Sequence, residues 1–278
     1  MAEKLNKDTI KNDVKKHYSD AIQVAENKTG GCCSSAVTAG KYAKLAGYSE
    51  QQLSELPAGI SVTSFGCGNP VDMLEMKEGD VVLDLGCGPG LDLFLAAKSI
   101  GSTGKAIGLD MTPAMLAKAR ENIKKSGLTN VEVREGEMED MPVDDNSVDW
   151  VISNCVINLS PDKQKVFSEI TRVLKPGGKM MVSDIVATGD IPDEIKNDKL
   201  AWSGCMGGAL PEQEYLQLAS DAGLIEVSVV NRLVYDRTQM AAFTTACCSD
   251  EQSDGFTEAQ VDQLAGKLAS VKVTGTKK

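Results

Sequence analysis

The segment from Val81 to Gly90, with the sequence VVLDLGCGPG, constrains the fold of this chain more than any other stretch. A short apolar run rich in β-branched residues, placed after the turn signal Gly79-Asp80, is typical of a buried parallel strand. The glycine-rich turn leads into residues 91–100, whose pattern predicts a helix. A strand, a tight glycine turn and a helix open a doubly wound α/β unit, in which ligands bind beyond the carboxyl ends of the strands.

The glycine spacing in this turn distinguishes two kinds of ligand. It reads G-x-G-x-G, with Leu91 where a dinucleotide-binding fingerprint has its third glycine. Asp84 stands two residues before the first glycine, where a carboxylate would repel a pyrophosphate but would face an ammonium group. S-adenosylmethionine carries an ammonium and a sulfonium, and we expect it here; glycines kept only for packing are the alternative. The residues expected to surround it are Asp84, Gly86, Cys87, Gly88 and Gly90.

The next two strands end in further candidates for the same cofactor site. Residues 105–109 predict a strand that ends at Asp110, which is suited to accept hydrogen bonds from ribose hydroxyls and is followed by Met111. Residues 131–134 predict a third strand, after which Glu137 or a neighbour is suited to bind the adenine amino group while Met138 packs on the base. Solvated turn acids are the alternative at both places.

The remaining pattern predicts one α/β core with an extension on each side. We expect helices and cysteine loops over residues 1–69, the cofactor-binding sheet over 70–187, and a smaller α+β substrate or lid domain over 188–278. The helices expected outside those already given are 8–27, 41–56, one begun by Thr112-Pro113, one capped by Ser160-Pro161, 211–223 and 257–270. The further strands expected are 148–153, 179–184, 227–230 and 232–235.

Charge and length narrow the class of protein. The formal net charge of −11 argues against nonspecific binding to nucleic acids or anionic membranes, since both reward clustered Lys and Arg. A length of 278 residues is enough to bury a sizeable core. The polar, charged start shows no secretory signal and the chain shows no apolar span of membrane length, so we expect a cytoplasmic, reducing compartment.

Cysteine is the residue type that stands out in such a compartment. The chain has 8 cysteines and only one histidine, His17, so any site for a soft ion must consist mostly of thiolates. Three of them have a local sequence that we do not expect of a cysteine filling the core: Cys67 between two glycines, Cys155 after Asn154 at a strand end and so at the mouth of the crevice, and Cys205 within a glycine-rich loop. The other candidates are the vicinal pair Cys32-Cys33, which two unengaged thiols would explain equally well, and a second pair, Cys247-Cys248, to which the sequence assigns no role.

These motifs resemble the arsenite S-adenosylmethionine methyltransferases over nearly the whole chain. The blocks that carry the resemblance are Cys32-Cys33, Ser64 to Pro70, Asp84 to Gly90, Gly108 to Thr112, Ser153 to Leu159 and Gly204 to Ala209. The glycine block is shared by many methyltransferases, whereas the three blocks around Cys67, Cys155 and Cys205 together are far more specific. The resemblance implies that Cys155 and Cys205 bind trivalent arsenic, and that Cys67 with Cys32 or Cys33 assists with arsenite or with redox turnover.

The chemistry that the family implies agrees with the residues. Trivalent arsenic is thiophilic and keeps an outward lone pair, which is the nucleophile toward a sulfonium methyl group, so no general base is needed. Catalysis is then mainly alignment of the reacting atoms. Transfer formally oxidises arsenic, and cysteine pairs are able to return two electrons and become disulfides for an external thiol, thioredoxin or glutathione to reduce. Arsenite and methylated trivalent arsenicals are the expected substrates.

Two other functions compete with this one. A class I methyltransferase for a small organic acceptor, such as a quinone or sterol precursor, would favour an aromatic pocket, but the chain has only two Trp, five Phe and five Tyr. A thiolate metalloid-binding protein on a vestigial fold is the other. An intact Asp84, glycine turn and Asp110 argue against it.

Overall fold

The computed structural model describes residues 6–28, 46–54, 56, 66, 68–248 and 256–278, and it is built around one sheet of seven strands. The strands are β1 (Val81–Leu85), β2 (Lys105–Asp110), β3 (Val131–Glu135), β4 (Val148–Asn154), β5 (Leu174–Ala187), β6 (Leu224–Val234) and β7 (Leu268–Lys277). Their order across the sheet is β3-β2-β1-β4-β5-β7-β6. The first five strands are parallel, and β7 runs antiparallel to both of its neighbours, β5 and β6.

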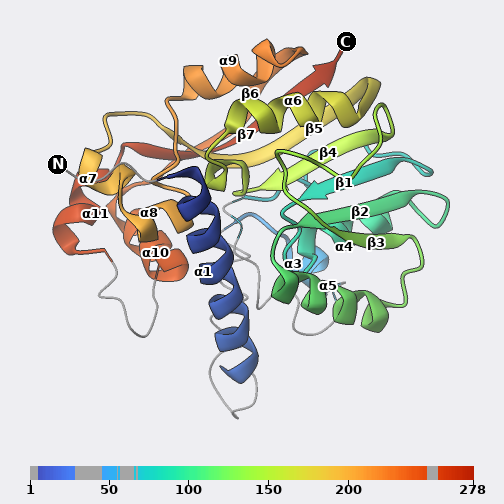
Figure 1. Cartoon of the computed structure of the whole chain (residues 1–278), viewed down its shortest axis with the longest axis horizontal. Coiled ribbons are helices and arrows are strands. Elements are labelled where there is room, and N and C mark those ends of the chain that lie inside the picture. The colour runs from blue at the N-terminus through green and yellow to red at the C-terminus, as the bar shows by residue number, and fades with distance from the viewer. Residues whose placement is uncertain (1–5, 29–45, 55, 57–65, 67, 249–255) are drawn as a thin grey trace.

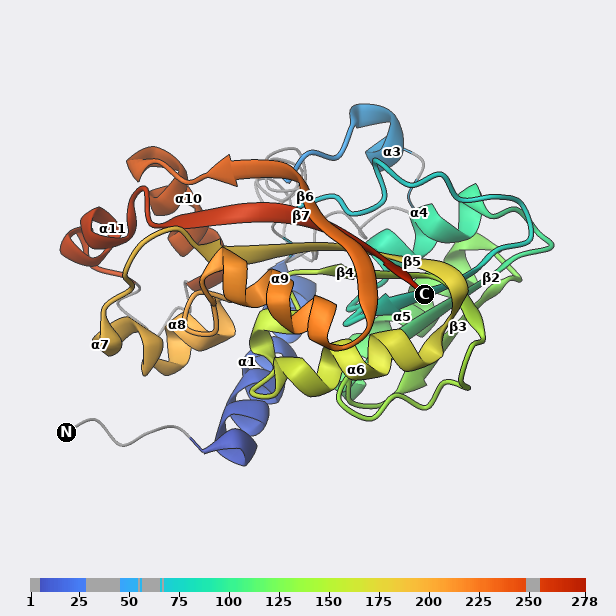
Figure 2. The ribbon, with the colours of Figure 1, turned by 90° about the horizontal axis from the view of Figure 1, so that it is seen from above.

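Helices cover both faces of this sheet, as Figure 1 shows. The helices are α1 (Lys7–Lys28), α3 (Glu50–Ser54), α4 (Leu91–Ser99), α5 (Pro113–Ser126), α6 (Lys163–Val173), α7 (Asp193–Lys196), α8 (Lys199–Ser203), α9 (Glu212–Asp221), α10 (Arg237–Cys248) and α11 (Glu258–Leu264), with a 3₁₀ turn, η2 (Ile157–Leu159). Helices α6 and α9 lie side by side on one face, which Figure 2 shows from above, and α4 and α5 lie on the other. This is the doubly wound α/β architecture that the glycine block predicts.

The alternation of side chains along each strand divides the core in two. On β1, Leu83 and Leu85 pack in the cluster that includes Phe167 of α6 and Tyr215 of α9. Val82, the residue directly before Leu83, packs in the opposite cluster with α4. Because successive side chains of a strand point to opposite faces, a run that is apolar at nearly every position is buried on both sides.

A third apolar cluster lies beyond the carboxyl end of the parallel strands. It joins α1, α8, α10 and α11 to the end of β5, and it contains both Cys155 and Cys205. Helix α1 contacts α8 on one side and α5 on the other, so it crosses the edge where the parallel strands end (Figure 1). The third cluster therefore frames the site described below.

Most predicted elements are confirmed, but several boundaries are wrong. The predicted tail helix ends at Leu264 as α11, and the chain from Leu268 is the strand β7. The two predicted strands at 227–230 and 232–235 are one strand, β6, which carries two register shifts against β7. In the described part of 41–56, only Glu50–Ser54 is helical.

Two helix starts can be compared with their predicted caps. Thr112 is the N-cap of α5 and Pro113 its first residue, as predicted. Helix α6 is capped by Asp162, whose side chain accepts a hydrogen bond from the Lys165 N–H, and not by Ser160. The Ser160 hydroxyl is instead hydrogen-bonded to Glu139.

The seven-stranded sheet also crosses the boundary expected at residue 187, because β6 and β7 extend the sheet that β1–β5 begin. In the part of the chain that the structure describes, no helix combines the length and the apolar character that crossing a bilayer requires.

Candidate active site

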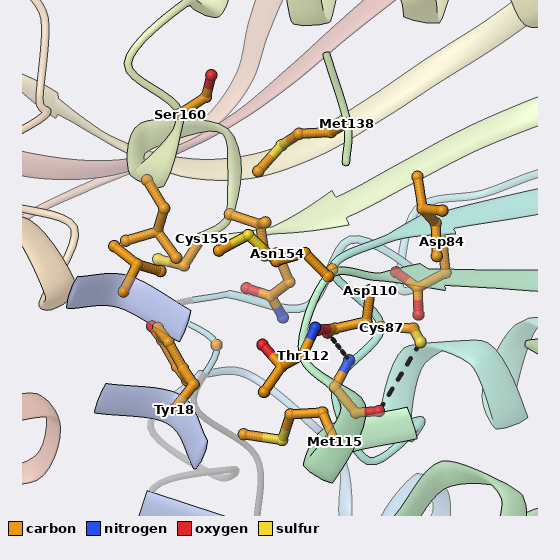
Figure 3. Close-up of a pocket in the computed structure, with 18 of the residues that line it drawn as sticks. Tyr18, Asp84, Cys87, Asp110, Thr112, Met115, Met138, Asn154, Cys155 and Ser160 are labelled. Atoms are coloured by element: carbon orange, nitrogen blue, oxygen red, sulfur yellow. Dashed lines mark hydrogen bonds between the residues drawn. The ribbon is translucent and has the colours of Figure 1, made fainter. Parts of the chain in front are cut away.

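A pocket opens where the strand order reverses, at the carboxyl ends of the neighbouring strands β1 and β4. Figure 3 shows how labelled side chains from α1, β1, β2 and β4 point toward it. The chain after β1 turns away through the glycines toward α4, while the chain after β4 continues through Cys155 into η2. A ligand in this pocket is therefore contacted from both halves of the sheet.

The glycine turn is held against the segment that follows Cys155. Gly86 has a φ of 62°, and a Cβ atom at this position would overlap the side chain of Val156. Gly88 has a φ of 50°, but a Cβ there would meet only the Met115 sulfur, at 4.0 Å, and so would fill part of the pocket. Positive φ and close approach both favour glycine. The turn thus gives a ligand direct access to its backbone.

Asp84 carries the most unusual group of the pocket. Its side chain is buried, and its Oδ2 atom has no hydrogen-bond partner among the described residues. Burial raises the pKa of this carboxyl well above its usual range, and the nearby Asp92 and Asp110 raise it further. A cationic group placed beside Oδ2 would offset each of these costs.

Asp110 stands at the carboxyl end of β2, two strands from β4. Its Oδ2 accepts a hydrogen bond from the Gly88 N–H (2.9 Å) and its Oδ1 accepts one from the Thr112 N–H (2.8 Å). These bonds fix the carboxylate at the pocket wall and tie it to the glycine turn (Figure 3). Each carboxylate oxygen has a second lone pair, so the group still has capacity to accept bonds from a ligand.

The loop after β3 forms another wall of the pocket. Met138 and Glu139 line it, whereas Glu137 is exposed and is not among the lining residues. Lys11 of α1 pairs with both acids, with its Nζ 2.6 Å from Glu137 and 3.2 Å from Glu139. Of the two acids, Glu139 is the one that a ligand in the pocket would contact.

Helix α1 closes one side of the pocket, a role that its sequence pattern did not reveal. Lys11, Val14 and Tyr18 line the pocket, one turn apart along the helix. The Tyr18 hydroxyl donates to the carbonyl oxygen of Ser203 (3.2 Å), which fixes this side chain next to the Cys205 loop. The spacing of Ile10, Val14 and Tyr18 predicts an apolar face, but not what that face covers.

Asn154 links four segments at the end of β4. Its Nδ2 donates to the Tyr48 hydroxyl (2.9 Å), to Asp92 (3.0 Å) and to the Gly68 carbonyl oxygen (2.6 Å), and its Oδ1 accepts from the Gly68 N–H (3.1 Å). Tyr48 in turn donates to Asp92 (2.6 Å). Burial raises the pKa of Asp92 to about 6, although bonds from Tyr48 and Asn154 oppose the shift. Asn154 therefore fixes the position of Gly68 beside the pocket.

Cys155, which follows β4, and Cys205, which follows α8, are brought together in the fold. The Cys205 sulfur lies 2.6 Å from the Cys155 carbonyl oxygen, and both residues are 3% exposed. Both also have left-handed backbones, with φ of 61° at Cys155 and 64° at Cys205. For residues other than glycine this conformation is strained and often marks a functional position. In this structure Cys155 is disulfide-bonded and Cys205 is a thiol.

The other predicted site residues fall into three groups. Gly86, Cys87, Gly88, Met111 and Asn154 line the pocket, whereas Gly90 lies behind it, where a Cβ would meet the Phe94 ring at 3.0 Å. Cys32, Cys33 and Cys67 lie outside the described residues. Cys247 and Cys248 end α10, but their side chains are outside the description. Within the described part of the chain, no three His, Cys, Asp or Glu side chains gather as a metal site.

Comparison with known proteins shows the family to which the chain belongs. A model of a methyltransferase domain matches residues 76–223. The chain is 44% identical over 200 residues to an arsenite methyltransferase of Halobacterium salinarum, an alignment that covers 72% of this chain and 51% of that protein. It is 32% identical over 265 residues to an arsenite methyltransferase of Aquipseudomonas alcaligenes, which covers 90% of this chain and 74% of that protein. The chain belongs to the arsenite methyltransferase family.

A solved member of the arsenite methyltransferase family has the same fold. The crystal structure of an arsenic(III) S-adenosylmethionine methyltransferase from Chlamydomonas reinhardtii matches with a TM-score of 0.60 at 32% identity, over 81% of this chain and 71% of that one. The chain thus spans about half to three quarters of the length of these relatives. The domain model includes the glycine turn, Cys155 and Cys205, but not α1, β6 or β7.

Proposed function

We propose that this chain is an S-adenosylmethionine-dependent arsenite methyltransferase that methylates thiolate-bound trivalent arsenic and so serves arsenic detoxification. The observation that carries this proposal is the contact of Cys205 with Cys155, which lines the pocket; both cysteines are buried and have a strained backbone. A soft trivalent ion prefers such sulfur ligands over oxygen or nitrogen.

The lining of the pocket fits the proposed cofactor. The buried Asp84 Oδ2 without a partner suits the cofactor ammonium, and the space beside Gly88 suits its close approach to the turn. Asp110, at the end of β2, has the lone pairs to accept bonds from the ribose hydroxyls, and Met138 lies where it would pack on the adenine ring. Glu139 replaces Glu137 as our candidate for the adenine amino group, because Glu139 lines the pocket. S-adenosylmethionine supplies a methyl group on a sulfonium sulfur.

The chain's own residues would hold arsenic and exclude water. Cys155 and Cys205, as thiolates, hold the ion with its lone pair directed to the pocket, and Val14 and Tyr18 of α1 shield that space. Methyl transfer would join arsenic to the methyl carbon and leave the electrons of the broken bond on the cofactor sulfur. Orientation of this kind contributes up to about 7–11 kcal/mol in well-aligned systems. No proton transfer is required, in accord with a chain whose single histidine, His17, is outside the pocket lining.

Two electrons must then return to arsenic to restore the trivalent state. We infer that a pair of cysteine thiols gives them and becomes a disulfide, which an external thiol such as thioredoxin or glutathione reduces. The disulfide at Cys155 agrees with a role of cysteine pairs in this step. Cys67, with Cys32 or Cys33, is our candidate for the remaining thiols.

Mass spectrometry of arsenic species tests the proposal. The protein is incubated with arsenite, methyl-labelled S-adenosylmethionine and excess thiol reductant, and we expect labelled mono- or dimethylated arsenic. Cys205→Ser should abolish the product while cofactor affinity, measured by calorimetry, stays within about twofold, since a hydroxyl is a poor ligand for a soft ion.

The same experiment separates the two alternatives. Cofactor binding without arsenic methylation, together with label transfer to an added quinone precursor, would identify a methyltransferase for organic acceptors. Tight arsenite binding with no transfer of label to any acceptor would indicate a metalloid-binding protein.

A further inference from the structure

Asn158 connects the segments that carry the two cysteines, and the proposed chemistry gives it no role. It belongs to η2, three residues after Cys155, and its side chain is fully buried. Its Nδ2 donates to the carbonyl oxygen of Ile185 (2.5 Å) and to that of Cys205 (3.3 Å). Its backbone N–H donates to Asp184 Oδ2 (3.1 Å). One side chain therefore joins the segment of Cys155, the end of β5 and the loop of Cys205.

Lys163 holds Asn158 from the other side. This lysine is almost fully buried at the start of α6, and its Nζ donates to the carbonyl oxygens of Asn158 (3.2 Å) and Ser160 (3.0 Å). Its ammonium also lies 5.5 Å from the centre of the Trp202 ring, and Trp202 donates to the Leu159 carbonyl oxygen (3.2 Å). Lysine is almost never buried unless it is paired. Here it fixes the backbone of η2 and the residue that precedes the Cys205 loop.

The Cys205 loop packs closely against the backbone of Asn158. A Cβ atom at Gly208 would overlap the carbonyl oxygen of Asn158, so the loop approaches η2 more closely than any side chain would allow. Gly208 does not have a positive φ, so close contact is the reason for glycine here. The contact faces the same carbonyl that Lys163 binds.

The electrostatics agree with a fixed cation at this place. Burial lowers the pKa of Lys163 to about 8, while Asp184 acts in the opposite sense, followed by Cys205, Glu139 and Glu214. Asp184 is buried too, and burial raises its pKa to about 6, opposed by the Ile185 N–H and by Lys163. The carboxylate and the ammonium therefore support each other on the two sides of Asn158.

We propose that Asn158, held by Lys163, is a positioning residue that sets the distance between Cys155 and Cys205 for arsenic binding. The proposal rests on the arsenic chemistry proposed above. Its physical reason is that the left-handed backbone of Cys205 is strained and needs an external bond to persist, which the Asn158 amide provides at the Cys205 carbonyl. Once one thiolate holds arsenic, the second bond is intramolecular, so its strength depends on this distance.

Two substitutions test the contact from its two sides. Asn158→Ala removes the amide, while Gly208→Ala keeps the amide and places a methyl group against the Asn158 carbonyl. Gly275→Ala is the matched control, because its Cβ would meet Val227 at an ordinary 3.4 Å. Should Asn158→Ala fail to fold, Gly208→Ala decides.

The readouts are the alkylation rate of each cysteine, resolved by peptide mass spectrometry on the reduced protein, and steady-state kinetics with monomethylarsonous acid. We expect both variants to raise alkylation of Cys205 at least about tenfold while Cys87, in the cofactor turn, changes less than about twofold. We expect the KM for monomethylarsonous acid to rise about tenfold or more with unchanged cofactor affinity. A general loss of structure would instead expose Cys87 as well.

Two results would overturn one or the other proposal. If both variants keep Cys205 alkylation and KM within about twofold of the unmodified chain, Asn158 does not set the distance between the cysteines. If the unmodified chain methylates no arsenical, the proposed function fails, and the alkylation rates still decide whether Asn158 holds the Cys205 loop.

Discussion

At the scale of single residues, Asp84 is a buried acid whose burial a cationic ligand would explain. An isolated buried carboxylate is costly, and a partner for its Oδ2 is absent among the described residues. Its neighbours Asp92 and Asp110 are also acids, and both raise its pKa further, so they do not offset its charge. We expect the cofactor ammonium to do so.

Asp84→Asn should weaken binding of S-adenosylmethionine by about 10- to 100-fold, because a hydrogen bond to a charged group is worth about 1.5–3 kcal/mol. The free energy of unfolding should not fall, since the variant removes an unpaired buried charge. Calorimetry and thermal denaturation measure the two effects, with the exposed Asp144→Asn as control. Equal affinity in Asp84→Asn and the unmodified chain would contradict the assignment.

The raised pKa of Asp84 also gives cofactor binding a pH dependence. In the free protein the carboxyl stays protonated to a higher pH than an ordinary aspartate, and only the ionised form pairs with an ammonium. Affinity should therefore rise as the pH increases through the pKa of Asp84 and level off above it, with protons released on binding. Titration calorimetry in buffers of different ionisation enthalpy measures that release, and a flat profile would argue against an ionic partner.

Cys67 is our candidate for a third sulfur ligand of arsenic, beside Cys155 and Cys205. Thiol-bound arsenite needs three sulfur partners, whereas monomethylarsonous acid carries one carbon and needs two. Cys67→Ser should therefore lose activity on arsenite and keep much of it on monomethylarsonous acid in excess reductant. An external thiol would fill the third position, so the assay compares a bulky thiol with a small one. Equal losses on both substrates would show that Cys67 is one of the two cysteines that hold every arsenical, or that it is structural.

At the scale of elements, the sequence predicts α1 but not its function. Its apolar spacing is local information, and the helix extends from Lys7 to Lys28 much as expected. Its place beside the pocket depends on contacts with α5 and α8, from distant parts of the chain. Asp84 and the glycine turn belong to one local motif, so the sequence could name them as candidates for the cofactor site. Tyr18, Asn158 and Lys163 reach the site through contacts between distant parts of the chain, so the sequence could not.

We expect the cofactor to order α1. Lys11, Val14 and Tyr18 line the pocket on one side, so a bound ligand should slow amide hydrogen exchange over residues 11–18 by about tenfold or more. Helix α11, which lies outside the pocket lining, is the internal control. Exchange that is equal with and without S-adenosylmethionine would mean that α1 does not close on the cofactor.

The strand β7 shows why the end of the chain was mispredicted. Val261 and Leu264 have helical spacing, and α11 does form with a capping box at Thr257. Beyond Gly266, Val271 and Val273 alternate with Ser270, Lys272 and Thr274, which is the period of a strand. This alternation is a local sign of a strand, which the prediction of one helix over 257–270 overlooked, whereas the pairing partners, β5 and β6, lie far away in sequence.

At the scale of the whole molecule, the sheet joins the segment after residue 187 to the core. β7 lies between β5 and β6, so the segment 188–278 contributes two strands to the sheet begun by β1. Val271 and Val273 are fully buried in the same cluster as Leu83. Packing of this kind favours one cooperative unit over two domains that unfold separately.

The two tryptophans report on the two sides of this boundary. Trp150 lies on β4 and donates to Asp80 (3.1 Å), and Trp202 lies on α8 against Lys163. Because the chain has two Trp, Trp202→Phe leaves Trp150 as the fluorescent probe of the core, and Trp150→Phe leaves Trp202 as the probe of the C-terminal segment. In denaturant titrations followed by fluorescence, each variant should show the same midpoint as its own far-ultraviolet circular dichroism, because one sheet loses its structure as a unit. An earlier fluorescence midpoint for Trp202 alone would instead establish residues 188–278 as a separately folding lid.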